Sequence, residues 1–137
     1  MTSSSAALTI VNPPALPDPS ANGYSTATVV PAGGRLAFVS GQGGFDAKGE
    51  LPADFAAQVA RTYDNLLAAV AGLGAGPEQV AKLTVFVVDH DMSKLAVLTE
   101  AVTHAFGDRL PAQTLVGVDR LAIDAMLFEV EAIVALG

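Results

Sequence analysis

Two glutamates near the C-terminus are the residues of this sequence best suited to chemistry. Glu129 and Glu131 alternate with apolar residues over 128–134, so on a β-strand they share one face. A carboxylate in a partly dry cleft has a raised pKa, which brings it toward the working range of a general base. The simpler alternative to a catalytic role, for either residue taken alone, is that it belongs to an exposed or edge-facing polar stripe of the strand.

Polar residues that could bind a ligand lie at the ends of two other predicted strands. Gln113 and Thr114 follow Pro111, and we expect them opposite the glutamates in a β-hairpin, at the end of the sheet. On a β-strand, Ser40 and Gln42 would lie on the same face as the apolar residues Leu36 and Phe38. A turn at the glycines that follow does not explain why these two positions are polar. These residues and the glutamates are therefore the candidate site.

Other candidate motifs have simpler structural explanations. The segment Gly41–Gly44 is no phosphate loop, because no GK[ST] follows and Asp46 stands where GxGxxG needs a glycine. We expect its glycines to serve a turn with positive φ. The run Asp89-His90-Asp91 cannot direct three side chains at one ion from an extended chain, so we expect a solvated turn and no metal site. His104 and the many serines offer only chance Ser-His-Asp combinations.

Charge and composition exclude several classes of function. Seven basic residues against fourteen acidic ones give a net charge of −7, the wrong sign for a nucleic-acid partner. The absence of cysteine excludes disulfides, thiolate metal sites and a cysteine nucleophile. Residues 1–9 contain no Lys or Arg, and no apolar run approaches the roughly 18 residues of a membrane span. We therefore expect no signal peptide, no membrane contact and a cytoplasmic protein.

The length of 137 residues fits one domain over residues 1–137. Apolar residues make up 51% of the chain, enough for one core, whereas charged residues make up only 15%, against about 25% in an average domain. A surface this short of charge and rich in alanine tolerates burial against another subunit. The composition therefore predicts an oligomer.

Hydrophobic patterning predicts the elements that position these side chains. Residues 1–20 comprise a short strand at Ala7–Val11 and a proline-rich connector. Further strands are predicted at 24–30, 35–42, 82–89, 113–119 and 126–136, the first two and the last two of these as hairpins. Apolar spacings of three and four predict helices at 53–73, with Gln58 and Asn65 among its polar residues, and at 93–106, with Ser93 as N-cap and Gly107 as the stop.

The order β-β-β-α-β-α-β-β predicts an α+β fold, a two-layer sandwich with two helices on one face of a mixed six-stranded sheet. Both faces of the 82–89 strand are apolar, so one layer of helices cannot cover it. A second subunit is the expected cover for the other face.

Five segments occur in a recognisable order: Tyr24-Ser25, Phe38–Gln42, Gln58–Leu67, Pro111–Val118 and Glu129–Ile133. Together they resemble the RidA family, also called YjgF and formerly described as translation inhibitors or endoribonucleases. The resemblance runs from about Tyr24 to Leu136. It implies a chorismate-mutase-like fold assembled as a homotrimer with clefts between subunits. It also implies hydrolysis of reactive 2-enamines or 2-imines to 2-keto acids and ammonia, with no cofactor or metal.

By this resemblance, Tyr24 matches the tyrosine that shapes the pocket and Glu129 the glutamate that positions water. The family arginine that holds the substrate carboxylate follows Pro-Ala, and here Gln113 stands in its place. An asparagine on the second helix of full-site members corresponds to Glu100. An amide lacks the fixed charge and the fork of donors of a guanidinium. Losing a bidentate guanidinium–carboxylate pair costs about 2–5 kcal/mol of binding free energy. We therefore expect weak or no deamination of 2-imino acids.

Two functions stay open. The first is a cofactor-independent hydrolase acting on an uncharged imine, enamine or related C–N compound, in which Tyr24 and Gln113 orient the substrate and Glu129 activates water. The remaining candidate binding residues are Thr114, Ser40, Gln42 and Glu100. The second is a non-catalytic trimeric protein that binds a small molecule or acts as a chaperone. Endoribonuclease activity or translation inhibition is the least supported reading, given the net charge of −7.

Overall fold

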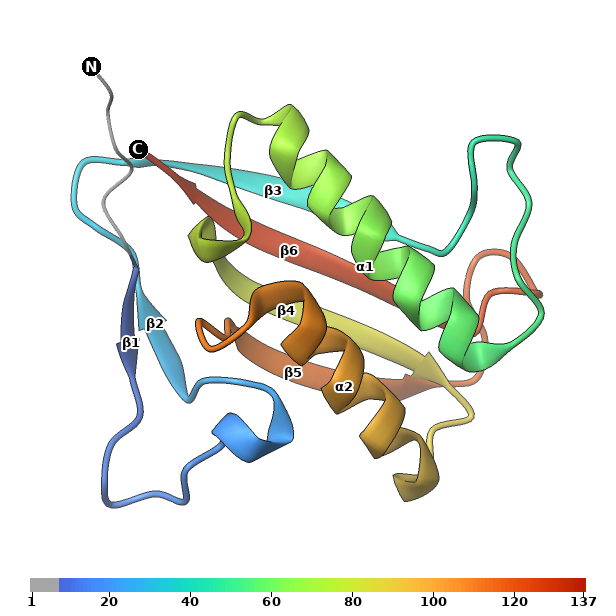
Figure 1. The fold of residues 1–137 in the computed structure, drawn as a ribbon, viewed down its shortest axis with the longest axis horizontal. Coiled ribbons are helices and arrows are strands. Elements are labelled where there is room, and N and C mark those ends of the chain that lie inside the picture. The colour runs from blue at the N-terminus through green and yellow to red at the C-terminus, as the bar shows by residue number, and fades with distance from the viewer. Residues whose placement is uncertain (1–7) are drawn as a thin grey trace.

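The computed structural model describes residues 8–137, in which six strands form two separate sheets (Figure 1). A four-stranded mixed sheet has the order β3-β6-β4-β5, with β4 parallel to β5 and antiparallel to β6. Its strands are β3 (Arg35–Gln42), β4 (Val80–Val88), β5 (Ala112–Val118) and β6 (Phe128–Leu136). A two-stranded antiparallel ribbon is formed by β1 (Thr9–Val11) and β2 (Ala27–Val29). The α+β class is confirmed, whereas the expected six strands divide into sheets of four and two.

Two helices, α1 (Phe55–Gly72) and α2 (Leu95–Phe106), cover one face of the four-stranded sheet, as expected (Figure 1). Asp54 caps α1 by accepting a hydrogen bond from the Ala57 N–H at 3.0 Å. The predicted N-cap at Ser93 is wrong: a 3₁₀ turn at Met92–Lys94 precedes α2, and the cap is Asp91, which accepts from the Ser93 N–H. Gly107, with φ of 65°, ends α2 as predicted.

The hydrophobic core lies between the helices and the sheet. From the helices come Val59, Tyr63, Leu66, Val70, Leu98, Val102 and Phe106, and from the sheet come alternate residues of β4 and β6. Tyr63 meets Phe106 edge-on at a ring-centroid distance of 6.3 Å, and its ring is tilted against Phe128 at 5.8 Å. The alternate side chains of each strand therefore belong to the opposite face, which no helix within residues 8–137 covers.

Neither predicted hairpin forms. β2 pairs with β1 and β3 pairs with β6, so the turn at Pro31–Gly34 connects the two sheets. β4 lies between β5 and β6, and Leu83 is opposite Gln113 on one side and Ala132 on the other. A strand that is apolar on both faces is most stable in the middle of a sheet, and this burial outweighs the short local connections.

The ribbon is attached to the main sheet by a few specific contacts. Leu8 packs with Ala81 and Ala135, and the Thr28 hydroxyl donates to the Ala81 carbonyl at 2.8 Å. Arg109 donates to the Leu8 carbonyl at 2.6 Å. The predicted first strand, Ala7–Val11, can be compared with the structure only from residue 8 onward, because residues 1–7 lie outside the described residues. Most of the stretch without Lys or Arg, residues 1–9, lies outside them as well. In the part of the chain that is described, no helix is long and apolar enough to cross a membrane.

Gln58, which sequence patterning assigned to the polar face of the first helix, is buried and ties α1 to the loop before β6. Its Nε2 donates to the carbonyls of Pro52 at 2.7 Å and Ala125 at 3.0 Å, and its Oε1 accepts from the Leu127 N–H at 2.9 Å. Asn65 acts similarly on the loop after β3, donating to the carbonyls of Gly43 and Phe45, both at 2.8 Å. These two amides fix where the chain leaves β3 and enters β6.

Replacing Gln58 by leucine is expected to lower the free energy of unfolding by about 3 kcal/mol, because three partly buried hydrogen bonds to the backbone are lost at about 1 kcal/mol each. Urea unfolding followed by circular dichroism measures this. The matched control is Gln42→Leu, because the Gln42 amide donates only to the nearby Ser40 carbonyl. Equal losses for both variants would show that the loop before β6 does not depend on Gln58.

Candidate functional site

Glu129 lies on the uncovered face of the sheet, opposite Phe86 of β4. Its side chain is half-buried, and the exposed Glu131 is two residues further along β6. Burial, and then the negative charge of Glu131, raise the pKa of the Glu129 carboxyl. The direction agrees with the sequence-based expectation of a carboxylate in a partly dry place, and it favours a base that can accept a proton.

The Glu129 carboxyl lies directly against the backbone of Gly41 on β3. A Cβ on Gly41 would be 2.6 Å from both Cδ and Oε2 of Glu129, closer than real contacts allow. Gly43 and Gly44 are equally tight, against the Met126 side chain and the backbone of Gln58. None of these three glycines has positive φ, so the turn predicted from them is wrong. They are needed for close approach of neighbouring groups.

Ser40 and Gln42 flank this contact but do not share one strand face, because the register slips between Val39 and Gln42. Val39 is opposite Ala132 and Gln42 is opposite Val130, so β3 holds one extra residue here. Ser40 is exposed, and the Gln42 amide donates to its carbonyl at 3.1 Å. The bulge interrupts the alternation of side chains along β3, so the prediction that Ser40 and Gln42 share one face of the strand is wrong.

Tyr24 and Gln113 form a second group, at the outer edge of β5. Ser25, beside Tyr24, forms an isolated parallel bridge with Ala112, beside Gln113. The Ser25 N–H donates to the Pro111 carbonyl at 3.0 Å and its hydroxyl to the Leu110 carbonyl at 2.5 Å. Tyr24 and Gln113 are both half-buried. Thus the buried Ser25 holds the predicted tyrosine next to the position that carries the predicted glutamine.

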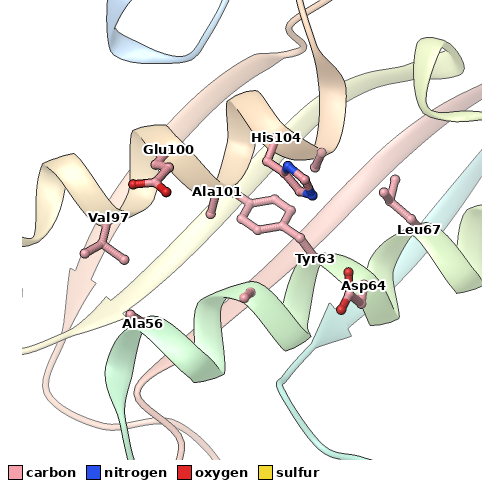
Figure 2. Close-up of a pocket in the computed structure, with 10 residues that line it drawn as sticks. Ala56, Tyr63, Asp64, Leu67, Val97, Glu100, Ala101 and His104 are labelled. Carbon is pink, nitrogen blue, oxygen red and sulfur yellow. The ribbon is translucent and has the colours of Figure 1, made fainter.

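Thr114 and Glu100 are the remaining candidate binding residues. Thr114 alternates with Gln113 along β5, and its hydroxyl accepts a hydrogen bond from the Lys82 ammonium at 2.8 Å. Glu100 is exposed on α2 and lines a groove between α1 and α2 together with Asp64, as Figure 2 shows. Glu100 is therefore on the helical side of the molecule and Glu129 on the uncovered side of the sheet.

One chain does not bring Gln113 and Glu129 together. Gln113 is opposite Leu83 and Glu129 is opposite Phe86, on the two sides of β4. Two strand spacings and three residues along the strand separate their Cα atoms by about 14 Å, and their side chains point to opposite faces of the sheet. A site that uses both residues needs them from different chains.

The segment after β4 is a turn, as expected, but it is not fully solvated, because the Nδ1 atom of His90 is buried. Asp89 has φ of 49°, and Lys94 donates to the carbonyls of Val88 at 3.0 Å and Asp89 at 2.6 Å. Asp91 is occupied as the cap of the following 3₁₀ turn. Over residues 8–137, no group of three or more His, Cys, Asp or Glu side chains is arranged to hold a metal ion.

Sequence reasoning missed three residues that position the site: Gly41, Gln58 and Asn65. The signal for Gly41 was present, since a glycine inside a strand marks a bulge or the close approach of another group. The two amides gave no such signal, because an amide in an amphipathic helix fits a solvated face equally well.

Gly41→Ala is expected to displace the Glu129 carboxyl and to lower the free energy of unfolding by no more than about 1 kcal/mol, because the atoms that its Cβ would meet are the far end of a flexible side chain. Gly72→Ala is the matched control: nothing lies within 4 Å of its added Cβ and its φ is not positive, so it should be neutral or stabilise by up to about 1 kcal/mol. Urea unfolding and the NMR titration of Glu129 report the two effects. An unchanged titration in Gly41→Ala would contradict the close contact.

Comparison with known proteins agrees with this architecture. The family model described as Endoribonuclease L-PSP matches residues 16–136. The 2-iminobutanoate/2-iminopropanoate deaminase of Escherichia coli K12 is 37% identical over 102 residues, which cover 73% of this chain and 79% of that protein. A RutC family protein of Pyrococcus abyssi is 36% identical over 112 residues, covering 80% and 84%.

Solved structures show the same fold. The conserved Rid family protein YyfB of Yersinia pestis superposes with a TM-score of 0.90 at 29% identity, covering 96% of this chain and all of that one (100%). E. coli TdcF, solved with bound serine, gives a TM-score of 0.68 at 30% identity, covering 83% and 88%. Since the family match includes nearly the whole described chain, and sequence relatives and fold agree with it, this chain belongs to the RidA (YjgF) family.

Proposed function

We propose that this protein is a homotrimer whose intersubunit clefts bind an uncharged imine, enamine or related C–N compound and hydrolyse it to a carbonyl product and ammonia. The observation that carries the proposal is Glu129, a half-buried carboxylate with a raised pKa on a sheet face that no helix covers. Gln113, in place of the family arginine, determines the class of substrate.

The trimer is supported by the apolar character of the uncovered face. Leu36 and Phe38 of β3 are 47% and 72% exposed in the single chain, and Val116 of β5 is 37% exposed. Phe86 and Ile133 lie on the same face, opposite Glu129 and Phe38. A patch of this kind is stabilised when a second surface removes it from water. A neighbouring subunit also supplies the second chain that a site with both Gln113 and Glu129 needs.

The substrate class follows from the chemistry of Gln113. An amide donates through its NH₂ group and accepts through its carbonyl, so it pairs well with a neutral carbonyl or amide. It offers no charge to a carboxylate, and the chain as a whole carries −7. The imino acids in the name of the E. coli relative and the serine bound to TdcF both carry a carboxylate. We therefore expect this protein to prefer an uncharged ligand.

In the proposed reaction, Glu129 accepts a proton from a bound water while the water oxygen bonds to the imine carbon. The imine nitrogen takes up a proton, giving a carbinolamine. Its C–N bond then breaks, ammonia leaves and the carbonyl forms, so one water is consumed for each C=N bond. Tyr24 and Gln113 orient the substrate, and no cofactor takes part.

A second candidate function is binding without turnover, as a trimeric small-molecule carrier or chaperone-like protein. The observation that favours it is the same replacement of arginine by Gln113, because binding energy that relatives gain from a charged pair is missing here. RNA cleavage and translation inhibition are not proposed, since the net charge of −7 opposes contact with a phosphate backbone.

The hydrolase is tested by ammonia release from freshly generated neutral imines and from 2-iminobutanoate. We expect acceleration with a neutral imine, rising with pH as Glu129 loses its proton, and little with 2-iminobutanoate. Gln113→Arg should raise 2-iminobutanoate hydrolysis at least about tenfold, and adding Glu129→Gln should remove the gain. Absence of acceleration with every imine would leave binding without turnover as the function.

The oligomer is tested by light scattering on Phe38→Glu. We expect the wild-type protein to be a trimer, three times the chain mass of 13.9 kDa, and the variant to dissociate because a charge enters the apolar contact. Met92→Glu is the control, since Met92 is 80% exposed but precedes α2, away from this face. A wild-type monomer at micromolar concentration, or dissociation of both variants alike, would contradict the interface.

A further inference from the structure

We infer that the groove between α1 and α2 is a second binding site, which takes a small organic cation with an apolar body. The groove has a volume of about 480 Å³, within the range of roughly 300–1,000 Å³ usual for small-molecule pockets. It lies between the two helices that cover one face of the sheet (Figure 2), and Glu129 is on the other face. The site is therefore independent of the proposed hydrolytic cleft.

Small side chains on both helices create the hollow. Ala56 and Ala60 of α1 and Ala101 and Ala105 of α2 line it, and in each helix the two alanines are four residues apart, on one face. Larger residues at these positions would fill the space. In Figure 2, Val97 and Leu67 lie toward opposite ends, and their hydrophobic side chains extend the apolar lining.

The Tyr63 ring lies between the helices at the bottom of this groove, as Figure 2 shows. It is only 4% exposed and is fixed by Phe106 and Phe128 at centroid distances of 6.3 and 5.8 Å. Burial raises the pKa of its hydroxyl, so the phenol stays neutral. A fixed aromatic ring attracts cations as well as apolar groups.

Charged residues at the groove are all acidic. Asp64 from α1 and Glu100 from α2 both line it, and Figure 2 shows them on opposite helices. His104, one turn after Glu100, is the remaining polar residue of the lining. All seven Lys and Arg residues lie within the described chain, and none of them lines the groove. Two carboxylates without a basic neighbour in the lining make the local potential negative, which favours a cation and disfavours an anion.

The lining selects for an amine with a hydrophobic body over a bare ion. Seven of the ten lining residues are alanine, valine, leucine or tyrosine, so most of the contact area suits hydrocarbon. An ammonium group can approach Asp64 or Glu100 while its hydrocarbon part lies over the alanines. The balance of apolar lining and two carboxylates therefore points to a primary amine of small size.

The probe for this site is 2-phenylethylamine, compared with 2-phenylethanol and 3-phenylpropanoate, which keep the ring and replace the ammonium by a neutral or an anionic group. Titrations followed by amide NMR should show the amine binding at least about tenfold more tightly than the alcohol, with shifts around Ala60 and Ala101. The propanoate should bind more weakly still. Equal binding of amine and alcohol, or no binding of the amine at 10 mM, would overturn the proposal.

Variants locate the binding. Asp64→Asn and Glu100→Gln should each weaken amine binding by about three- to tenfold and leave alcohol binding unchanged, because only the charge is lost. Asp108→Asn is the matched control, an exposed carboxylate just beyond α2 that is outside the lining. Ala60→Leu, at an exposed position, should weaken all probes by filling the groove. Unchanged amine affinity in the double variant Asp64→Asn/Glu100→Gln would place the amine elsewhere and overturn the assignment.

Discussion

Because β4 carries apolar side chains on both of its faces, it has to occupy the middle of the sheet, and the arrangement of the other elements depends on that position. Leu83, Val85 and Val87 pack under the helices, and the alternate residues face the other side. β5 and β6 then take the two edges of β4. The helices cover one face only, so the other face keeps Phe86 opposite Glu129 and Phe38 opposite Ile133. The central strand thus separates Gln113 from Glu129.

The position of Glu129 depends on contacts from outside its own strand. Gly41 on β3 leaves room for the carboxyl, and the amides of Gln58 and Asn65 hold the loops before β6 and after β3. Partial burial in this corner, with Glu131 close by, raises the pKa of Glu129. A base on a mobile surface strand would be solvated and would keep an ordinary pKa. The raised pKa is therefore a consequence of packing that extends as far as α1.

Periodicity in the sequence was enough to locate both helices and the four main strands to within about two residues, since the alternation of apolar side chains is a local property. Pairing between strands is not local, which is why both predicted hairpins were wrong: Pro31–Gly34 has turn chemistry, but the strands on either side find other partners. The role of Gln58 was equally hidden, because its three partners come from distant loops. That Tyr24 and Gln113 act together was expected only through the family resemblance, and in the structure their neighbours Ser25 and Ala112 form a parallel bridge.

The distribution of positive charge links the two proposed sites. Lys94 donates to the carbonyls of Val88 and Asp89, Arg109 donates to the Leu8 carbonyl, and Lys82 donates to Thr114. Three of the seven basic side chains are thus hydrogen-bonded within the fold, while residue 113 is a glutamine and the two charged residues that line the helical groove, Asp64 and Glu100, are carboxylates. A donor that is already satisfied by a carbonyl or hydroxyl gains less from a ligand anion than a free one. The two proposed sites follow this distribution of charge, a neutral ligand being proposed at Gln113 and a cationic one between the helices.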